Sequence, residues 1–231
     1  MLFVLASIVF MQAQDDAEKV LRGIHAFYND HPHVYQEINY NLYADHNTTV
    51  PHTTEKGVLV ISKEARYARM ANIESLVTKS LTIGVDHDEQ TLVISNNPSG
   101  MDFDPLESIQ PYLEGLNSAT VRSTSGKYNQ LTLTTDIGEV KQVDIFYHKE
   151  NYQLEKIILT YRREIQLEDE PDADLVKPRL EIDYTLTGLE RKGKALLQLN
   201  QYVQISGDNY KPAGKYAGYN LINNIYPNPI K

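Results

Sequence analysis

One stretch near the start of the chain has the apolar spacing of a helix. Between residues 20 and 28 the apolar side chains recur three and four positions apart, which places them on one helix face. They are Val20, Leu21, Ile24, Phe27 and Tyr28. Asp15 and Glu18 have the spacing of a capping box, and Pro32 disfavours a helix beyond Asp30. The pattern therefore predicts a helix over residues 15–30.

From residue 34 onwards apolar and polar residues alternate, which is the period of a strand with one buried face. Polar turns over residues 86–89, 136–139 and 149–151 predict hairpins between neighbouring strands. About ten strands, each with one apolar face, are typical of an antiparallel sheet that is wetted on one side. The predicted strands cover residues 34–44, 58–61, 67–77, 81–85, 91–95, 130–133, 142–148, 156–161, 180–186 and 197–205.

A second, shorter helix is predicted from Pro105, with Leu106, Ile109 and Leu113 on one side. Two helices are too few to cover a flat sheet of ten strands, but a strongly curved sheet can wrap around them. We therefore expect an α+β fold that is mostly antiparallel β. Its form is a curved, unclosed β-barrel (a half-barrel) of about ten strands, with the N-terminal helix and the short second helix on its concave face.

The first residues have the composition of an export signal. Residues 2–10 read LFVLASIVF, an apolar run of signal-peptide length that is too short to span a bilayer. Ala13 offers a small residue before Gln14, and Asp15-Asp16 then changes the composition abruptly. The basic residues that open a signal peptide are missing, which indicates a truncated start. We expect a signal peptide over residues 1–13 and one mature domain over residues 14–231, soluble, periplasmic and not membrane-spanning.

Charge and cysteine content exclude several classes of protein. The chain has 22 Lys and Arg against 31 Asp and Glu, a net charge of −9. This balance argues against a nucleic-acid partner, which requires clustered basic residues. There is no cysteine, and hence no disulfide, thiol nucleophile, thiolate zinc site or lipid-anchoring cysteine.

The polar clusters in the sequence give no catalytic or metal site. His31 and His33, with His25 upstream, lack the convergent ligands that a metal needs. Residues 168–174 hold five carboxylates but lack the spacing of a calcium loop, so we interpret them as a solvated loop. Residues 86–89, Asp-His-Asp-Glu, are expected at a turn in any case. We predict no catalytic residue, no metal and no cofactor, and therefore no enzyme.

In the first three strands predicted after residue 128 the odd-numbered positions are all apolar, so on each strand these side chains share one face. The alternate apolar residues within 38–42 supply a matching face. The chain also has 16 tyrosines and no tryptophan, and several tyrosines fall on these faces. If the sheet curves, these side chains converge and line an apolar cavity against the helix. An ordinary filled core is the alternative. The predicted lining is Phe27, Ile38, Tyr40, Leu42, Leu131, Leu133, Ile145, Tyr147, Ile157, Leu159 and Tyr161.

The arrangement resembles the LolA/LolB-like lipoprotein-carrier superfamily. Residues 57–61, GVLVI, followed by 65–70, ARYARM, are similar to the superfamily's hairpin of a glycine-led apolar strand and a basic–aromatic strand. Residues 81–86, LTIGVD, and 91–95, TLVIS, are similar to its next hairpin, although the usual aromatic residue is absent. The richness in Tyr and Asn is similar to that of Bacteroidetes envelope proteins.

The resemblance implies a function as well as a fold. Members of the superfamily are unclosed barrels whose concave face is plugged by helices and accepts acyl chains. We therefore expect an exported, non-enzymatic carrier or binding protein for a lipid or for the acyl chains of a lipoprotein. The alternative is a protein-interaction subunit of a bacterial envelope or secretion assembly, which uses the same fold with a filled core and binds an envelope protein partner.

Overall fold

The computed structural model describes residues 2–31, 33–96, 116–124, 126–167, 175–187, 191–207 and 209–225. The short helix predicted from Pro105 and the acidic loop 168–174 lie outside the described residues. The helices are α1 (Leu2–Asp30), α2 (Arg191–Leu196), and the 3₁₀ turns η2 (Leu199–Gln201) and η3 (Gly214–Tyr216).

The strands follow one another along most of the chain. They are β1 (His33–Tyr43), β2 (Thr53–Ser62), β3 (Ala65–Met70), β4 (Ile73–Thr78), β5 (Leu81–Asp86), β6 (Thr91–Asn96), β7 (Leu116–Ser123), β8 (Tyr128–Thr135), β9 (Val140–His148), β10 (Leu154–Tyr161), β11 (Ile165–Gln166), β12 (Leu175–Val176), β13 (Arg179–Leu186), β14 (Val203–Ser206), β15 (Asn209–Pro212) and β16 (Asn220–Asn224).

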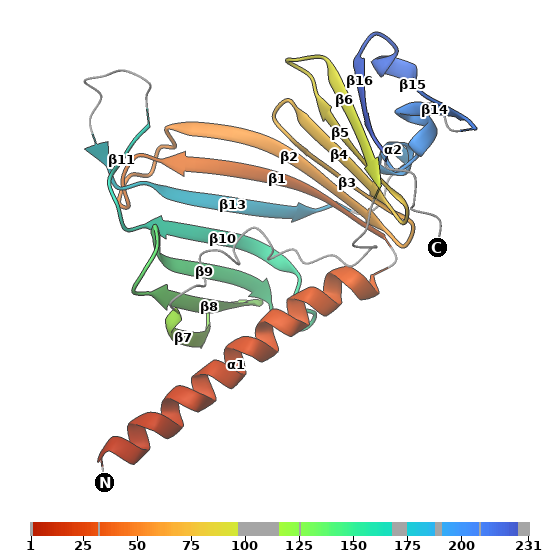
Figure 1. The fold of residues 1–231 in the computed structure, drawn as a ribbon. Coiled ribbons are helices and arrows are strands. Elements are labelled where there is room, and N and C mark those ends of the chain that lie inside the picture. The colour runs from red at the N-terminus through yellow and green to blue at the C-terminus, as the bar shows by residue number, and fades with distance from the viewer. Residues whose placement is uncertain are drawn as a thin grey trace. The chain divides into compact units, whose positions relative to one another are not determined.

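Twelve of these strands form one long sheet (Figure 1). Its order is β16, β6, β5, β4, β3, β2, β1, β13, β10, β9, β8 and β7. Neighbours from β2 to β6 and from β13 to β7 pair antiparallel, whereas β16 pairs parallel with β6. The end strands β16 and β7 do not pair with each other, so the sheet stays open. The predicted fold class, mostly antiparallel with an unclosed sheet, is confirmed.

Within this architecture the chain forms two compact units, each assembled from three stretches. Unit 1 comprises Met1–Asp30, Asn39–Glu55 and Phe103–Tyr184, and unit 2 comprises His31–Ile38, Lys56–Asp102 and Thr185–Lys231. Unit 1 therefore holds α1 and strands β7 to β12. Unit 2 holds β3 to β6 and the C-terminal elements. The expectation of a single domain over residues 14–231 stays a prediction.

Helix α1 ends at Asp30 as predicted but begins at Leu2, so Asp15 lies inside the helix and does not cap it. Residues 2–14 contain no proline or glycine to interrupt the helix, which explains why it continues through them. The buried stripe is Ala17, Val20, Ile24, Phe27 and Tyr28, while Leu21 is half-buried. Among the described residues, no helix is both long and apolar enough to cross a membrane.

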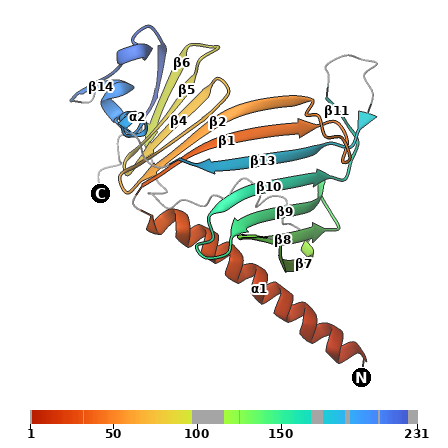
Figure 2. The same cartoon turned by 180° about the vertical axis from the view of Figure 1, so that it is seen from behind.

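Helix α1 packs against the strands of its own unit at a glycine. It contacts β7, and Figures 1 and 2 both show it running beside β7 and β8. A Cβ atom added at Gly23 would lie 2.6 Å from the ring of Tyr152. That ring stacks on Tyr147, with ring centroids 5.6 Å apart and an interplanar angle of 6°. The absent side chain of Gly23 therefore lets the helix approach this tyrosine pair closely.

Two of the predicted strands are wrong in detail. Residues 67–77 form two strands, β3 and β4, because the chain turns at Ala71, whose φ of 48° lies in the left-handed region. Residues 197–205 form a strand only from Val203, since Leu199 belongs to the 3₁₀ turn η2. The predicted hairpins at residues 86–89, 136–139 and 149–151 are confirmed as β5–β6, β8–β9 and β9–β10.

Candidate functional site

Six of the residues predicted to line a cavity lie close together in unit 1. Leu131, Ile145 and Ile157 are register partners across β8, β9 and β10, and Leu133 and Leu159 flank Val143 in the next row. Tyr147 lies two residues beyond Ile145 on β9, on the same face.

These rows are closed in the structure. Leu131, Ile145 and Ile157 have no exposed surface. Phe27 and Ile38 are also buried, and Tyr40, Leu42 and Tyr161 are half-buried. An acyl chain could reach the rows only if the segments that cover them moved. Their role in binding stays a prediction.

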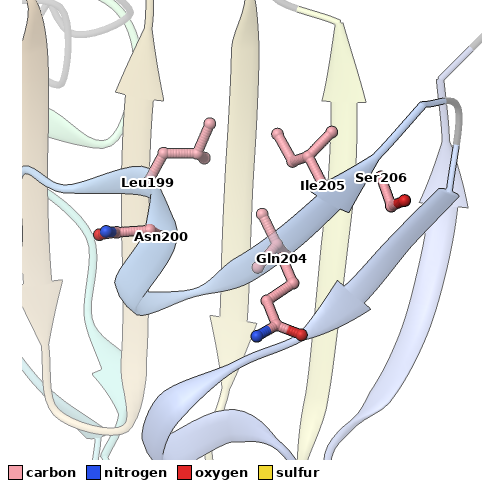
Figure 3. A pocket seen from close by; sticks show the side chains of 6 residues that line it. Leu199, Asn200, Gln204, Ile205 and Ser206 are labelled. Atoms are coloured by element: carbon pink, nitrogen blue, oxygen red, sulfur yellow. The ribbon is translucent and has the colours of Figure 1, made fainter.

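Unit 2 contains an open groove of about 550 Å³, which the sequence did not indicate. Its lining comes from η2 and β14: Leu199, Asn200, Val203, Gln204, Ile205 and Ser206. Figure 3 shows the side chains of Leu199 and Ile205 extending to the same side of the ribbon, with Gln204 on the other side. Val203 is buried, whereas Ile205 is 47% exposed. The groove therefore combines aliphatic side chains with amide and hydroxyl groups and has no charged lining residue.

The β14–β15 hairpin positions the groove. Val203 pairs with Pro212 and Ile205 pairs with Tyr210, so alternate residues of β14 face the same way. The apolar spacing of the lining residues is visible in the sequence, because Leu199, Val203 and Ile205 lie an even number of positions apart, as residues on one strand face do. This spacing predicted one continuous strand over residues 197–205, and the 3₁₀ turn η2 was missed.

A cluster of tyrosines lies next to the groove residues in the same unit. Tyr202 and Tyr216 are buried, and their rings stack with centroids 5.2 Å apart. The hydroxyl of Tyr202 donates to the carbonyl oxygen of Leu196 at 2.8 Å. A smaller pocket of about 220 Å³ borders these rings and is lined by Ala195, Leu196, Gln201, Tyr202, Lys215 and Tyr216. The stacked tyrosines thus form a support for η2, which Tyr202 follows directly in the chain.

Glu74 is a buried carboxylate at the centre of this support. It lies on β4 in the inward-facing row with Val85 and Leu92, and only 1% of it is exposed. Lys215 Nζ (2.8 Å) and His87 Nε2 (2.6 Å) contact its Oε1, and the hydroxyl of Tyr216 donates to its Oε2 at 2.6 Å. Burial alone raises the pKa of Glu74, but the hydrogen bonds from Lys215, Tyr216 and His87 outweigh it and hold the pKa below its usual value.

His87 therefore has a carboxylate partner other than the ones beside it in the sequence. Its Nδ1 contacts the hydroxyl of Tyr219 at 2.8 Å, while its Nε2 contacts Glu74. The neighbouring Asp88 instead accepts hydrogen bonds from the side chain of Asn72. Sequence reasoning missed Glu74 because its partners follow it by 13 to 142 residues.

His25, one of the histidines considered as metal ligands, has another contact. Its ring contacts Asn29 one turn along α1. Within the described ranges, no group of three or more His, Asp or Glu residues is arranged to hold a metal ion.

Comparison with known proteins finds similar solved structures but no matching sequence. No family model and no curated protein sequence matches it. Among solved structures, a LolA superfamily protein of Nitrosomonas europaea covers 76% of this chain and 96% of its own, with 10% identity and a TM-score of 0.31. The solved structures that resemble this chain thus include a member of the superfamily named above.

Two further solved structures have somewhat higher scores. An uncharacterized conserved protein of Thermus thermophilus matches over 90% of this chain and 99% of its own, with 9% identity and a TM-score of 0.44. The MucA/MucB complex of Pseudomonas aeruginosa matches over 86% of this chain and 63% of that chain, with 12% identity and a TM-score of 0.47.

Proposed function

We propose that this protein is an exported, non-enzymatic binding protein that carries the acyl chain of a lipid or lipoprotein in the bacterial periplasm. The observation that carries the proposal is the groove beside η2 and β14, a space of about 550 Å³ without a charged lining residue. Each methylene that an acyl chain buries gains about 0.8 kcal/mol, so even a partly seated chain can offset the cost of its ordering.

Two places in the chain could take the acyl chain under this proposal. The groove of unit 2 is already open, and the amide and hydroxyl groups at its rim suit a polar headgroup or ester. The rows around Ile145 in unit 1 are buried, so an acyl chain could enter them only after an opening movement. The groove is the simpler site because binding there does not require packed side chains to separate.

Uptake of a fluorescent fatty acid tests the proposal and distinguishes the two sites. We expect Ile205→Asp to weaken binding of the probe about tenfold or more, because the new carboxylate loses water when an acyl chain covers it. Ile73→Asp is the matched control, since Ile73 is similarly exposed (51%) in the same unit but outside the groove. We expect it to bind as the wild type does, and affinities come from fluorescence titration.

The other outcomes of the titration are equally informative. If Ile145→Trp weakens uptake and Ile205→Asp does not, the acyl chain binds in unit 1, as the sequence predicts. If the folded wild type takes up no probe, the carrier function is wrong.

A protein-interaction role is the second candidate, and a separate observation favours it. Met70 and Ile73 pair across the β3–β4 turn and are 49% and 51% exposed, so an apolar pair faces solvent. Among the described strands, the end strands β16 and β7 of this sheet each have a neighbour on one side only.

Native mass spectrometry of the protein purified from an envelope fraction separates the two functions. The carrier function predicts a bound mass of lipid size, and the interaction function predicts a protein partner without lipid. The same spectrum measures the mature mass, for which we expect a start near Gln14. A chain that retains Met1 would contradict export by a cleaved signal.

A further inference from the structure

The carboxylate of Glu74 is the point at which the C-terminal segment, residues 213–225, contacts β4. Lys215 and Tyr216 of this segment both bind Glu74 directly. The third partner, His87, reaches the same segment through the hydroxyl of Tyr219. Each of these three side chains therefore either belongs to the C-terminal segment or binds it.

Beyond this cluster the segment is held by a strand pairing and by partly buried apolar side chains. It continues into β16, which pairs with β6 and forms the end of the sheet. Within residues 213–225 Ala213 and Tyr216 are buried, and Ile222 is 42% exposed. Three further apolar side chains are half-buried and pack against the core of unit 2: Tyr219, Leu221 and Ile225. The position of β16 on the sheet thus depends on its backbone hydrogen bonds, on these apolar contacts and on the anchor at Tyr216 and Glu74.

The anchor works in only one protonation state of the carboxylate. An ionised carboxylate accepts hydrogen bonds at both oxygens, as the contacts with Lys215, His87 and Tyr216 require. A protonated carboxyl group becomes a donor at one oxygen and no longer attracts the Lys215 ammonium. Its other charged neighbour across the sheet is Arg69, its register partner on β3, and the remaining groups around it are the hydroxyls of Tyr67, Tyr202 and Tyr216.

We propose that Glu74 is a proton-controlled latch: its ionised form holds the C-terminal segment on unit 2, and its protonation releases β16 and exposes the edge of β6. In the closed state β16 of the same chain pairs with β6 and covers this edge. The inference does not depend on what the protein carries.

The direction of the pH dependence follows from the pKa of Glu74. Because the folded state lowers this pKa, ionisation stabilises the docked segment fully above the ordinary pKa of Glu, about 4.3. The stabilisation is lost as the pH falls through the lowered folded value. The latch is therefore closed at neutral pH and opens in acid.

Hydrogen exchange of the full chain, read as protection factors for peptides over residues 213–225, tests the proposal. Glu74→Gln mimics the protonated state, and at neutral pH we expect it to lower protection in these peptides about tenfold or more. Protection in β3 and β5 should change far less. Lys215→Met removes one donor, leaves the carboxylate in place, and covers the case in which Glu74→Gln does not fold.

The matched control is Asp144→Asn in unit 1. Asp144 is also a buried carboxylate with three side-chain hydrogen bonds, from Gln130, Thr132 and Gln142. Its replacement should leave the protection of residues 213–225 unchanged.

Acidification supplies the second arm of the test. In the wild type we expect the protection of residues 213–225 to fall on acidification, below the ordinary pKa of Glu of about 4.3, before that of β3 and β5. In Glu74→Gln it should be low throughout. The proposal is overturned if the wild-type segment stays protected in acid that unfolds β3 and β5. It is also overturned if Glu74→Gln and Lys215→Met both leave the segment protected. If either variant lowers protection equally across unit 2, Glu74 is an ordinary core residue and the proposal fails as well.

Discussion

Phe27→Ala lowers the free energy of unfolding by about 3–5 kcal/mol, the range for removal of a buried phenylalanine side chain. Phe27 lies on the buried stripe of α1, and its ring meets that of Tyr28 edge-on at 5.1 Å. The substitution removes apolar area and leaves a cavity that the neighbouring side chains fill only partly. Chemical denaturation of the full chain, followed by circular dichroism, measures the loss.

Leu21→Ala is the control for this prediction. Leu21 lies on the same helix but is half-buried, so its truncation removes less contact area. We expect its effect to be clearly smaller than that of Phe27→Ala. A change below about 0.5 kcal/mol for Phe27→Ala would place α1 outside the core of unit 1.

Leu92→Ala lowers the free energy of unfolding by about 2–5 kcal/mol, the range for a buried leucine. Leu92 has no exposed surface, and its register partners are Val85 on β5 and Leu221 on β16. It belongs to the apolar core of unit 2, so the cavity left by the substitution has close neighbours on both sides. The measurement is again chemical denaturation, with two optical probes to detect separate transitions.

Val93→Ala is the control for Leu92→Ala, because it shortens a side chain on the opposite face of β6. Val93 is adjacent to Leu92 but points to the other side of the sheet, where it is only partly buried. We expect a loss of about 1 kcal/mol or less. Equal effects at the two positions would mean that β6 is covered on both faces.

The sequence predicts a strand correctly where one face of that strand is buried, because the alternation of apolar and polar residues then fixes its register. In β5 and β6 the inward residues Ile83, Val85, Leu92 and Ile94 alternate with half-buried positions, and a polar turn joins the two strands. The turn at Ala71 was missed because it contains neither glycine nor proline. The strand at 197–205 was wrong because alternate apolar residues also occur where a 3₁₀ turn leads into a short strand.

The candidate site was less predictable than the fold. The groove depends on how η2 and β14 meet, a tertiary arrangement that no local pattern encodes. Glu74 has the sequence context of a surface residue on an amphipathic strand, yet it faces inward. What stabilises it there is the arrival of Lys215 and Tyr216, 141 and 142 residues later in the chain, and such a long-range pairing leaves no signal in one sequence.

The parallel strand β16 has a consequence for the order of events in folding. Hairpins β2 to β6 lie close together in sequence and can form early, while β16 must return from far along the chain to reach β6. The outer edge of β6 is therefore bare until β16 has paired with it. Such an unpaired edge can pair with other incompletely folded chains. We expect slow closure of unit 2, and a need for chaperones during that interval that the finished sheet no longer has.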